Sequence, residues 1–459
     1  MDENLQAYLI GNAQRSLDEL INLLRIPSVS TDPQHRVDID RAAGWVAEKL
    51  RAAGPLKVEI QPTDGHPVVY AEWLGKPGAP TVLVYGHYDV QPPDPLEEWQ
   101  SPPFEPTIVD DRLYARGVSD DKGPMLIPIK AVEALFATES ELPVNLKMIF
   151  EGEEEIGSPN LDAYLRDHAE QLAADFVVSA DGAMWRPTEP SVNLGSRGMV
   201  AVNLEVTGPS KDLHSGRHGG AVQNPLHALV ELLATLHKPD GEVAVEGFYD
   251  DVREPSAELR DQIAALGFDE NEYARHLGVP ALFGEPGYSA LEREWVRPTL
   301  EINGLGGGYQ GEGSKTVIPS RAQAKITCRL VPDQDPDRIA ALVEKHLRTR
   351  TPPGVAVTVS RQPGGTTAYR IPPDHPGLTI AREVLRRQFG QEPANVLIGG
   401  SLPLADLVRQ RLGIDLIFFS FSTADEDFHA PNEFLRLDRF RRGIASWIDF
   451  WAMAGKSVA

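Results

Sequence analysis

The sequence predicts an α/β protein of two domains, in which an α+β domain is inserted into a domain built on a mainly parallel sheet. Three observations support this prediction. The chain has 459 residues, more than a single hydrophobic core usually serves. Its first part alternates short apolar runs with amphipathic segments, as parallel sheets covered by helices do. The middle part alternates apolar and polar residues, as half-exposed antiparallel strands do, and the first pattern returns near the C-terminus.

The first domain is expected to contain helices and strands in alternation. Apolar residues at helical spacing predict helices over residues 5–24, 41–51, 125–136 and 160–168. Short apolar runs predict strands at residues 56–60, 66–74, 81–86, 144–150 and 174–180. Several of these runs are continuously apolar, which suits strands covered on both faces.

The inserted domain is expected to combine antiparallel strands with a few helices. Strands are predicted at residues 199–208, 299–305, 321–331 and 355–361, and helices at 224–238, 335–348 and 377–389. Residues 241–298 read as a long irregular stretch, and the glycine-rich residues 304–311 as a flexible turn. A further strand, 414–422, and a closing helix, 437–451, return the chain to the first domain. The predicted boundaries are 1–195 with 400–459 for the first domain and 196–399 for the insertion.

The strongly acidic composition excludes two classes of partner. The chain carries 44 basic and 67 acidic residues, a formal net charge of −23 at pH 7, which repels nucleic-acid phosphates and anionic lipid headgroups. No apolar run approaches the ~20 residues of a membrane-spanning helix, and the N-terminal stretch lacks the basic and apolar regions of a signal peptide. We therefore expect a cytoplasmic protein that binds neither nucleic acid nor membrane.

Cys328 is the only cysteine, so the chain can form no internal disulfide and no thiolate metal cluster. It lies inside an apolar, strand-like run. This position predicts a buried structural thiol rather than a nucleophile.

Polar, mostly acidic residues follow four predicted strands of the first domain. In chain order they are His87 with Asp89, Glu154 with Glu155, Asp181, and His429, and Asp120 lies in an acidic turn between the first two strands. In open α/β sheets, ligands bind at the carboxyl ends of the strands. Histidines and carboxylates gathered there suit a pair of divalent cations.

Each of these signals is weak when taken alone. A single histidine after a strand is usually a polar loop residue, an acidic run is usually a solvated turn, and Ser-Asp-Asp-Lys-Gly is a common turn composition. Their joint occurrence, each in a loop after an apolar run, predicts a metal site.

Seven motifs, taken in order, resemble the successive signatures of one enzyme family. They are GHYDVQP, RGVSDDKGP, EGEEEIGS, SADG, DLHSGRHGG, SKTVIP and GGSLP. The chain resembles the dinuclear-metal peptidases, a family that includes glutamate carboxypeptidase, aminoacylase, succinyl-diaminopimelate desuccinylase and carnosinase. It is most similar to the branch of carnosinase and cytosolic nonspecific dipeptidase. The resemblance implies a zinc-exopeptidase-like catalytic domain and an inserted lid domain that forms a homodimer.

The resemblance also implies the ligands of two metal ions. Asp120 would bridge the ions, His87 and Asp181 would complete one ion's protein ligands, and Glu155 and His429 the other's. The ions would be zinc, with manganese or cobalt as alternatives.

Four further roles near the metals follow from the resemblance. Asp89 would orient His87, as partners of metal-bound histidines do. Asp121 would follow a cis peptide bond, and Glu154 would be the general base. His214 would be the donor to the oxyanion, supplied by the partner subunit.

Three residues resemble the family's substrate contacts. Arg329 resembles the arginine that binds the terminal carboxylate, a task that suits its planar fork. Without the resemblance, an edge-strand arginine in a surface ion pair is about as good an interpretation. Thr316 and Ser401 resemble further contacts to the substrate's carboxylate or backbone.

The main hypothesis is a metal-dependent hydrolase of dipeptides or short peptides with a free C-terminal carboxylate. An N-acyl amino-acid deacylase is the second, because the same site cleaves any amide. The third is a non-catalytic metal-binding or scaffold protein. Such a protein would be expected to have lost Glu154, which binds no metal, so its presence argues against this third hypothesis.

Overall fold

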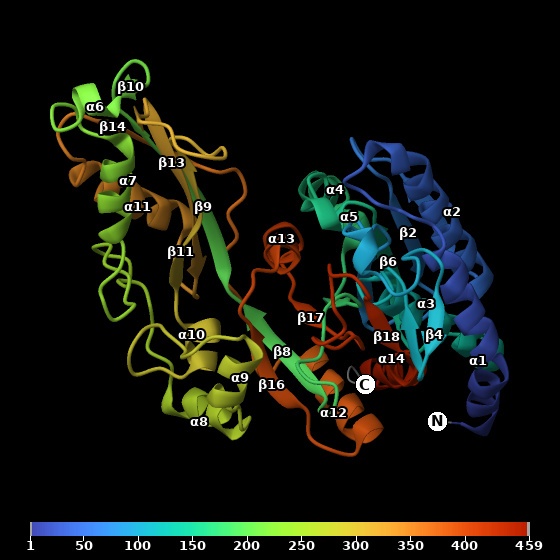
Figure 1. Cartoon of the computed structure of the whole chain (residues 1–459). Coiled ribbons are helices and arrows are strands. Elements are labelled where there is room, and N and C mark those ends of the chain that lie inside the picture. The colour runs from blue at the N-terminus through green and yellow to red at the C-terminus, as the bar shows by residue number, and fades with distance from the viewer. Residues whose placement is uncertain (1, 457–459) are drawn as a thin grey trace. The chain divides into compact units, whose positions relative to one another are not determined.

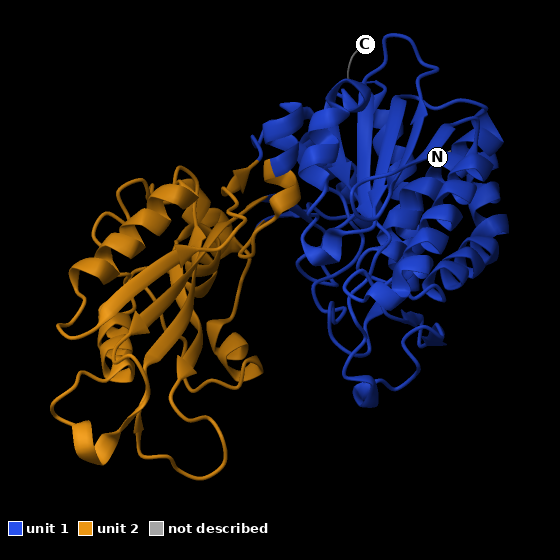
Figure 2. Ribbon diagram, turned by 90° about the horizontal axis from the view of Figure 1, so that it is seen from above, with its two compact units in different colours: residues 1–194, 371–396, 407–459 blue, residues 195–370, 397–406 orange. Residues whose placement is uncertain are grey.

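The computed structural model describes residues 2–456 and divides into two compact units (Figures 1 and 2). Unit 1 comprises residues 1–194, 371–396 and 407–459, and unit 2 comprises residues 195–370 and 397–406. The α/β fold class is confirmed. None of the helices in the described part of the chain is both long and apolar enough to cross a membrane.

Unit 2 differs from the expected insertion in two segments: residues 371–396 belong to unit 1, and residues 400–406 belong to unit 2. The first of these segments is the larger. This segment contains α12 (Pro376–Phe389), which packs against α14 (Leu437–Ala454). The Phe176 ring of β7 (Phe176–Ser179) meets the rings of His375, which precedes α12, and of Phe450 in α14 edge-on. An amphipathic pattern shows that a helix has a buried face but not which core it faces.

A six-stranded sheet forms the centre of unit 1, in the order β1-β2-β6-β3-β7-β17. Its strands are β1 (Lys57–Gln61), β2 (Val68–Trp73), β3 (Thr81–His87), β6 (Asn145–Glu151), β7 (Phe176–Ser179) and β17 (Leu416–Phe418). β3 lies between β6 and β7 and is parallel to both, and β17 is parallel to β7. The four strands that precede the predicted site residues are therefore adjacent and parallel, and their carboxyl ends share one edge.

Helices of unit 1 cover this sheet, as Figure 1 shows. They are α1 (Glu3–Leu24), α2 (Arg36–Ala53), α3 (Lys122–Glu139), α4 (Leu161–Asp167), α5 (Ala169–Leu172), α12, α13 (Pro403–Leu412) and α14, of which α13 crosses into unit 2. Single 3-10 turns occur at Pro33–His35, Leu96–Glu98 and Glu154–Ile156. α3 contacts α1, α2 and α14 and is buried along most of its length.

Two small sheets were not predicted, because most of their strands are too short to show an alternation of apolar and polar residues. One has the order β18-β5-β4, with β18 (Phe434–Arg436), β5 (Arg112–Tyr114) and β4 (Thr107–Val109). The other has the order β15-β8-β16, with β15 (Tyr369–Arg370), β8 (Ser191–Ser196) and β16 (Ala394–Ile398).

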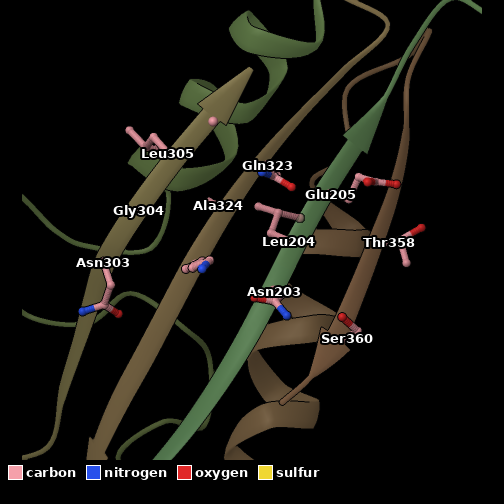
Figure 3. Close-up of a pocket in the computed structure, with 12 residues that line it drawn as sticks. Asn203, Leu204, Glu205, Asn303, Gly304, Leu305, Gln323, Ala324, Thr358 and Ser360 are labelled. Atoms are coloured by element: carbon pink, nitrogen blue, oxygen red, sulfur yellow. The ribbon is translucent and has the colours of Figure 1, made fainter. Parts of the chain in front are cut away.

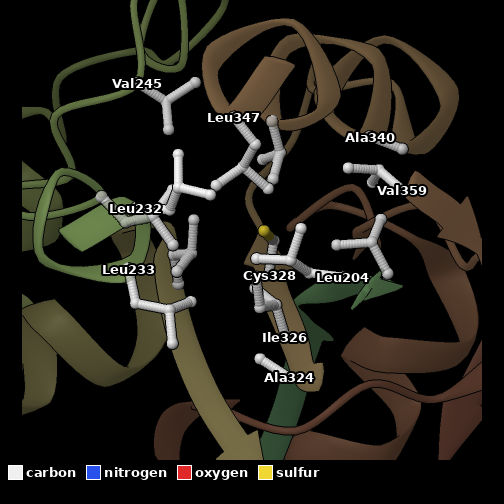
Figure 4. Packing of buried hydrophobic residues seen from close by; sticks show 14 of the residues in the cluster. Leu204, Leu232, Leu233, Val245, Ala324, Ile326, Cys328, Ala340, Leu347 and Val359 are labelled. Carbon is white, nitrogen blue, oxygen red and sulfur yellow. The ribbon is translucent and has the colours of Figure 1, made fainter. Parts of the chain in front are cut away.

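Unit 2 is built on an antiparallel sheet of order β11-β13-β9-β14. The strands are β11 (Thr299–Gly307), β13 (Arg321–Leu330), β9 (Gly198–Thr207) and β14 (Ala356–Arg361). α7 (Pro225–Ala234) and α11 (Pro336–Thr349) pack against it. Alternate side chains of β9 and β13 enter the core between sheet and helices (Figure 4), where Cys328 is 1% exposed. The predicted burial of Cys328 is confirmed.

Two stretches of unit 2 are more regular than predicted. Residues 241–298 contain α8 (Ala257–Ala265), α9 (Glu270–His276) and α10 (Ala290–Val296). The side chains of Ser256, Asp269 and Ser289 cap these helices, which are too short for periodicity to reveal them. The glycine-rich run expected to be a turn belongs to β11 as far as Gly307. Two more short elements of unit 2 pair as strands, β10 (Leu213–His214) and β12 (Val317–Ile318), and α6 (Ser215–His218) follows β10.

The face of the unit 2 sheet that points away from its helices is polar (Figure 3). A hollow of about 580 Å³ lies over it, lined by Asn203, Glu205, Asn303, Gln323, Lys325, Thr358 and Ser360 among others. None of the predicted site residues lines this hollow.

Candidate metal centre

His87 is the last residue of β3 and is completely buried. Its Nδ1 lies 3.2 Å from the Asp89 carbonyl oxygen and 3.4 Å from Asp89 Oδ1. With acceptors on that side, the Nδ1 carries the proton and the Nε2 is left as a ligand atom. The Nε2 faces Asp120 Oδ1 at 3.1 Å.

Gly86 was expected to end the strand, but β3 continues through it to His87. The reason for glycine here is space. A Cβ on Gly86 would lie 2.8 Å from Asp121 Oδ2, the atom that accepts a hydrogen bond from the His87 backbone N–H. The close approach of Asp121 thus requires a residue without a side chain.

Asp120 faces two histidines with its two carboxylate oxygens. Its Oδ1 is turned to His87, and its Oδ2 lies 2.9 Å from His429 Nε2. The peptide bond from Asp120 to Asp121 is cis, as the resemblance implies.

The carboxyl ends of β3, β6 and β7 bring two groups of possible ligands together. One group is His87, Asp120 and Asp181, and the other is Asp120, Glu155 and His429. Within each group the ligand atoms all lie within 4.8 Å of one another. Asp120 belongs to both groups, which is the arrangement expected of a bridging carboxylate.

Asp89 is buried and holds the turn after β6 in place. Its Oδ1 and Oδ2 accept hydrogen bonds from the backbone N–H groups of Glu154 and Glu155, at 3.2 and 3.1 Å. Because the same side chain also contacts His87, it fixes the positions of two candidate ligands, His87 and Glu155.

Glu154 belongs to neither group of ligands, and its carboxylate forms no hydrogen bond or ion pair with any described residue. Burial raises its pKa well above the usual value for a glutamate. The charge of His87 lowers the pKa, whereas the nearby charges of Asp181, Asp120 and Glu155 raise it further. The Glu154 carboxylate therefore lies beside the two ligand groups without being held by a described residue.

The charges at this edge perturb one another strongly. Hydrogen bonds to Asp120 and Glu155 raise the pKa of His429 to about 10, and burial raises the pKa of Asp181 to about 6. Burial opposes protonation of His87, but its contacts with Asp120 and Asp89 raise its pKa well above the usual value. In the chain without metal, protons thus occupy positions that cations could take.

The donor set fits a pair of divalent cations. Imidazole nitrogens and carboxylate oxygens suit zinc and are also accepted by manganese. One buried polar atom beside the candidate ligands also lacks a partner: Asp121 Oδ1 accepts no hydrogen bond from any described residue. A buried polar atom without a partner is costly, which fits a site that is completed by a bound group.

His214 and Thr316 are neighbours on the exposed surface of unit 2. β10 and β12 pair His214 with Val317, and the Thr316 carbonyl oxygen accepts a hydrogen bond from the Ser215 backbone N–H at 3.1 Å. His214 Nδ1 accepts a hydrogen bond from the Gly216 backbone N–H at 3.0 Å. The proton of the neutral ring is therefore on Nε2, which is left free to donate.

Arg329 and Ser401 also lie together in unit 2. The guanidinium donates to Ser401 Oγ at 2.9 Å, and Arg329 forms no ion pair with any described residue. β13 is a central strand rather than an edge strand, so Arg329 is not the edge-strand arginine of the alternative interpretation. A half-buried arginine without a carboxylate partner is a candidate for binding an anion.

The sequence profile of peptidase family M20/M25/M40 matches residues 83–452. The chain belongs to this family. It is 32% identical over 448 residues to Cys-Gly metallodipeptidase dug1 of Schizosaccharomyces pombe, covering 93% of this chain and 92% of that protein. It is 31% identical over 425 residues to human Beta-Ala-His dipeptidase, covering 88% and 83%. These relatives confirm the resemblance to the carnosinase and dipeptidase branch, and the chain is a peptidase.

Solved structures agree with this assignment. The M20 family metallo-carboxypeptidase Sso-CP2 from Sulfolobus solfataricus is 34% identical, with a TM-score of 0.84 over 99% of this chain and 100% of that one. Human carnosine dipeptidase 1 is 28% identical, with a TM-score of 0.84.

Two residues at the site were missed by the sequence analysis. Gln91 donates from Nε2 to Glu155 Oε2 at 2.8 Å, and its place inside the GHYDVQP motif could have signalled a role. Glu433 accepts hydrogen bonds from the backbone that carries Asp120. It lies in a turn four residues after His429, where a glutamate is usually solvated, so the sequence held no signal for it.

Proposed function

We propose that this peptidase hydrolyses dipeptides or short peptides with a free C-terminal carboxylate, using two divalent metal ions and Glu154. The observation that carries the proposal is the pair of ligand groups that share Asp120, with the unpartnered Glu154 carboxylate beside them. The activities for which two relatives are named, a Cys-Gly metallodipeptidase and a Beta-Ala-His dipeptidase, support a dipeptide substrate.

In this proposal, His87, Asp120 and Asp181 hold one ion, and Asp120, Glu155 and His429 hold the other. A pair of cations lowers the pKa of a water molecule and thereby supplies a nucleophile at neutral pH. Zinc is the favoured ion, because histidine and carboxylate are its usual catalytic ligands.

The chain's own residues move the protons. Glu154 accepts the proton of the attacking water and returns it to the amine that leaves, as a general base and then a general acid. Its raised pKa suits both steps, since a base that is too weak would hold no proton for the leaving group. Asp89 fixes the position of the turn that carries Glu154 relative to His87.

Unit 2 supplies the contacts to the substrate in this proposal. The Nε2–H of the partner subunit's His214 donates to the oxygen that becomes negative as the carbonyl is attacked. Arg329 and Ser401, which lie together, bind the terminal carboxylate, and Thr316, which lies next to His214, makes a further contact to the substrate. We also propose that the protein is a homodimer through unit 2. Exposed edge strands such as β11 and β14 offer unpaired backbone groups to a second copy.

A substrate panel tests the proposal. Protein treated with a chelator and then dialysed is expected to lose hydrolysis of Cys-Gly and β-Ala-His and to regain it when zinc, manganese or cobalt is added. N-acetyl amino acids serve as the matched substrates without a free α-amino group. Faster hydrolysis of these than of any dipeptide would overturn the proposal, as would activity that survives chelation.

A further inference from the structure

Glu433 is completely buried, and its carboxylate accepts four hydrogen bonds. Oε1 accepts from the backbone N–H groups of Ser119 and Asp120, at 2.8 and 3.1 Å. Oε2 accepts from the backbone N–H of Gly117 and from the Arg116 guanidinium, both at 2.8 Å. A single side chain thus satisfies three amides of the segment that ends at Asp120.

An ionised carboxylate satisfies all four of these donors, while burial raises the pKa of Glu433 to about 7. Each of its oxygens accepts two hydrogen bonds, and all four donors are fixed N–H groups. A glutamine of the same size has one oxygen, and its NH₂ group would meet two donors. Leaving buried N–H groups without an acceptor is unfavourable, so the backbone would have to move.

The segment that directly precedes Glu433 in the chain carries His429. The two residues are separated by a turn in which His429 and Asn432 both have positive φ, 61° and 66°. The Glu433 carbonyl oxygen also accepts a hydrogen bond from the Ala115 backbone N–H at 3.1 Å. Glu433 therefore joins the turn that holds His429 to the segment that holds Asp120.

Asp120 has to present one oxygen to each ligand group, so a small rotation of its backbone would misplace both oxygens. Its N–H group is one of the three that Glu433 holds. The arrangement matches that of Asp89, whose carboxylate holds the N–H groups of Glu154 and Glu155. The buried carboxylates of Asp89 and Glu433 thus fix the two acidic segments of the site by accepting hydrogen bonds from their backbone N–H groups.

We infer that Glu433 is a positioning residue for both metal ions: it fixes Asp120 and His429 in their binding arrangement before any metal is present. This inference rests on the metal site proposed above. It predicts that loss of the Glu433 carboxylate weakens metal binding but has little effect on kcat once the enzyme is saturated with metal.

The test is the metal affinity of Glu433→Gln, measured by zinc titration in competition with a chromophoric chelator. The dissociation constant for zinc is expected to rise about 10–100-fold, the usual effect of losing a residue that supports a metal ligand. With zinc in excess, kcat for a dipeptide should recover to within a few-fold of wild type and KM should not change. A dissociation constant equal to that of wild type in the folded variant would overturn the inference.

Glu292→Gln is the matched control. Glu292 is a buried glutamate in unit 2 that accepts a hydrogen bond from the Ser289 backbone N–H at 2.7 Å, so the same substitution removes a similar carboxylate far along the chain from the metal ligands. It is expected to lower thermal stability without changing zinc affinity. An equal loss of zinc affinity in this control would show that the effect is a general one and would overturn the inference.

Two further measurements keep the inference testable if Glu433→Gln does not fold. Glu433→Asp keeps the charge but is shorter by one methylene, so its zinc affinity should fall by a smaller factor, and wild-type affinity would contradict the inference. In metal-free wild type, the amides of residues 117–120 should exchange hydrogen as slowly as with zinc bound. Fast exchange without zinc would show that the metal, not Glu433, orders the segment. If wild type binds no metal at all, the proposed function fails instead.

Discussion

The carboxyl edge of the unit 1 sheet and the substrate-contact residues of unit 2 are organised in opposite ways. In unit 1, the candidate ligand atoms of each group lie within 4.8 Å of one another, and Asp89 and Glu433 hold the backbone beside them. In unit 2, the predicted substrate contacts lie in two separate pairs, and His214 and Thr316 are exposed. Charges are crowded at the first site, whereas at the second Arg329 has no ionic partner among the described residues.

This difference indicates that the two regions have different tasks. In our proposal, the unit 1 site is arranged for metal before any ion binds, because buried hydrogen bonds to Asp89 and Glu433 hold the backbone of its candidate ligands. The unit 2 residues keep unused donors, the Nε2–H of His214 and the guanidinium of Arg329, for a molecule that is bound only transiently. Substitutions of the candidate ligands and their supporting residues in unit 1 should therefore change metal content, and substitutions in unit 2 should change substrate kinetics alone.

The largest effect is expected from Asp120→Asn. Asparagine keeps the size of the side chain but removes the charge that both ligand groups share, so both ions should be lost. Dipeptide hydrolysis should fall by more than the ~10²–10⁴-fold that a general base contributes, with metal content measured by mass spectrometry of the dialysed protein. Asp269→Asn, at an exposed helix cap that asparagine also fills, should change neither quantity. An Asp120→Asn protein that keeps two ions would contradict the bridging role.

Arg329→Ala tests the unit 2 side of the comparison. Loss of a charged hydrogen bond of about 1.5–3 kcal/mol should lower kcat/KM for a dipeptide by about 10–100-fold, while metal content stays at the wild-type level. Arg329→Lys keeps the charge but lacks the planar guanidinium, so its kcat/KM should lie between the values of wild type and Arg329→Ala. The decisive substrate is the matching dipeptide amide, which lacks the carboxylate: wild type and Arg329→Ala should hydrolyse it equally well. A variant defect that persists on the amide would rule out a carboxylate contact.

The pH dependence of metal binding should be steeper than that of an isolated site with ordinary pKa values. Because the pKa of His429 is raised to about 10 in the metal-free chain, this residue is protonated at pH 7 and a metal ion must displace its proton. Zinc affinity should therefore fall as the pH falls, by about tenfold per pH unit for each proton displaced. Calorimetry in two buffers of different ionisation enthalpy should detect at least one proton released per chain at pH 7. Binding without proton release would show that His429 is not a ligand.

The smallest effect is expected at Cys328, in the core of unit 2. Burial raises the pKa of its thiol to about 12, so the native protein should not react with a thiol reagent at pH 8 and its activity should be unaffected. One thiol per chain should react after unfolding in guanidinium. Reaction in the native state with loss of activity would place a functional thiol in unit 2.

Sequence could predict those parts of the molecule that depend on long periodic patterns and on ordered motifs. The strands that carry His87, Glu155 and Asp181 were predicted because continuous apolar runs of this length are typical of buried parallel strands. Their convergence followed from the rule that the carboxyl ends of parallel strands share an edge. Strands of two or three residues, such as β18, and the short capped helices of 241–298 could not be predicted because a period needs more residues to appear.

The contacts that support the site could not be predicted from the sequence either. Glu433 is separated from Asp120 by 313 positions in the chain, and it lies outside the seven motifs that drew attention to the site. The unit to which α12 belongs was missed for a related reason, since its amphipathic face fits either core. In both cases the deciding contact lies far away in sequence and leaves no local pattern.

The central claim, that Glu154 moves protons at a two-metal site without binding metal, is tested most directly by Glu154→Gln. Glutamine keeps the size of the side chain and removes only its ability to accept a proton. The account predicts that the purified variant retains two metal ions per chain while its kcat for a dipeptide falls by about 10²–10⁴-fold. A variant that hydrolyses the dipeptide as fast as wild type, or one that loses its metal, would contradict it.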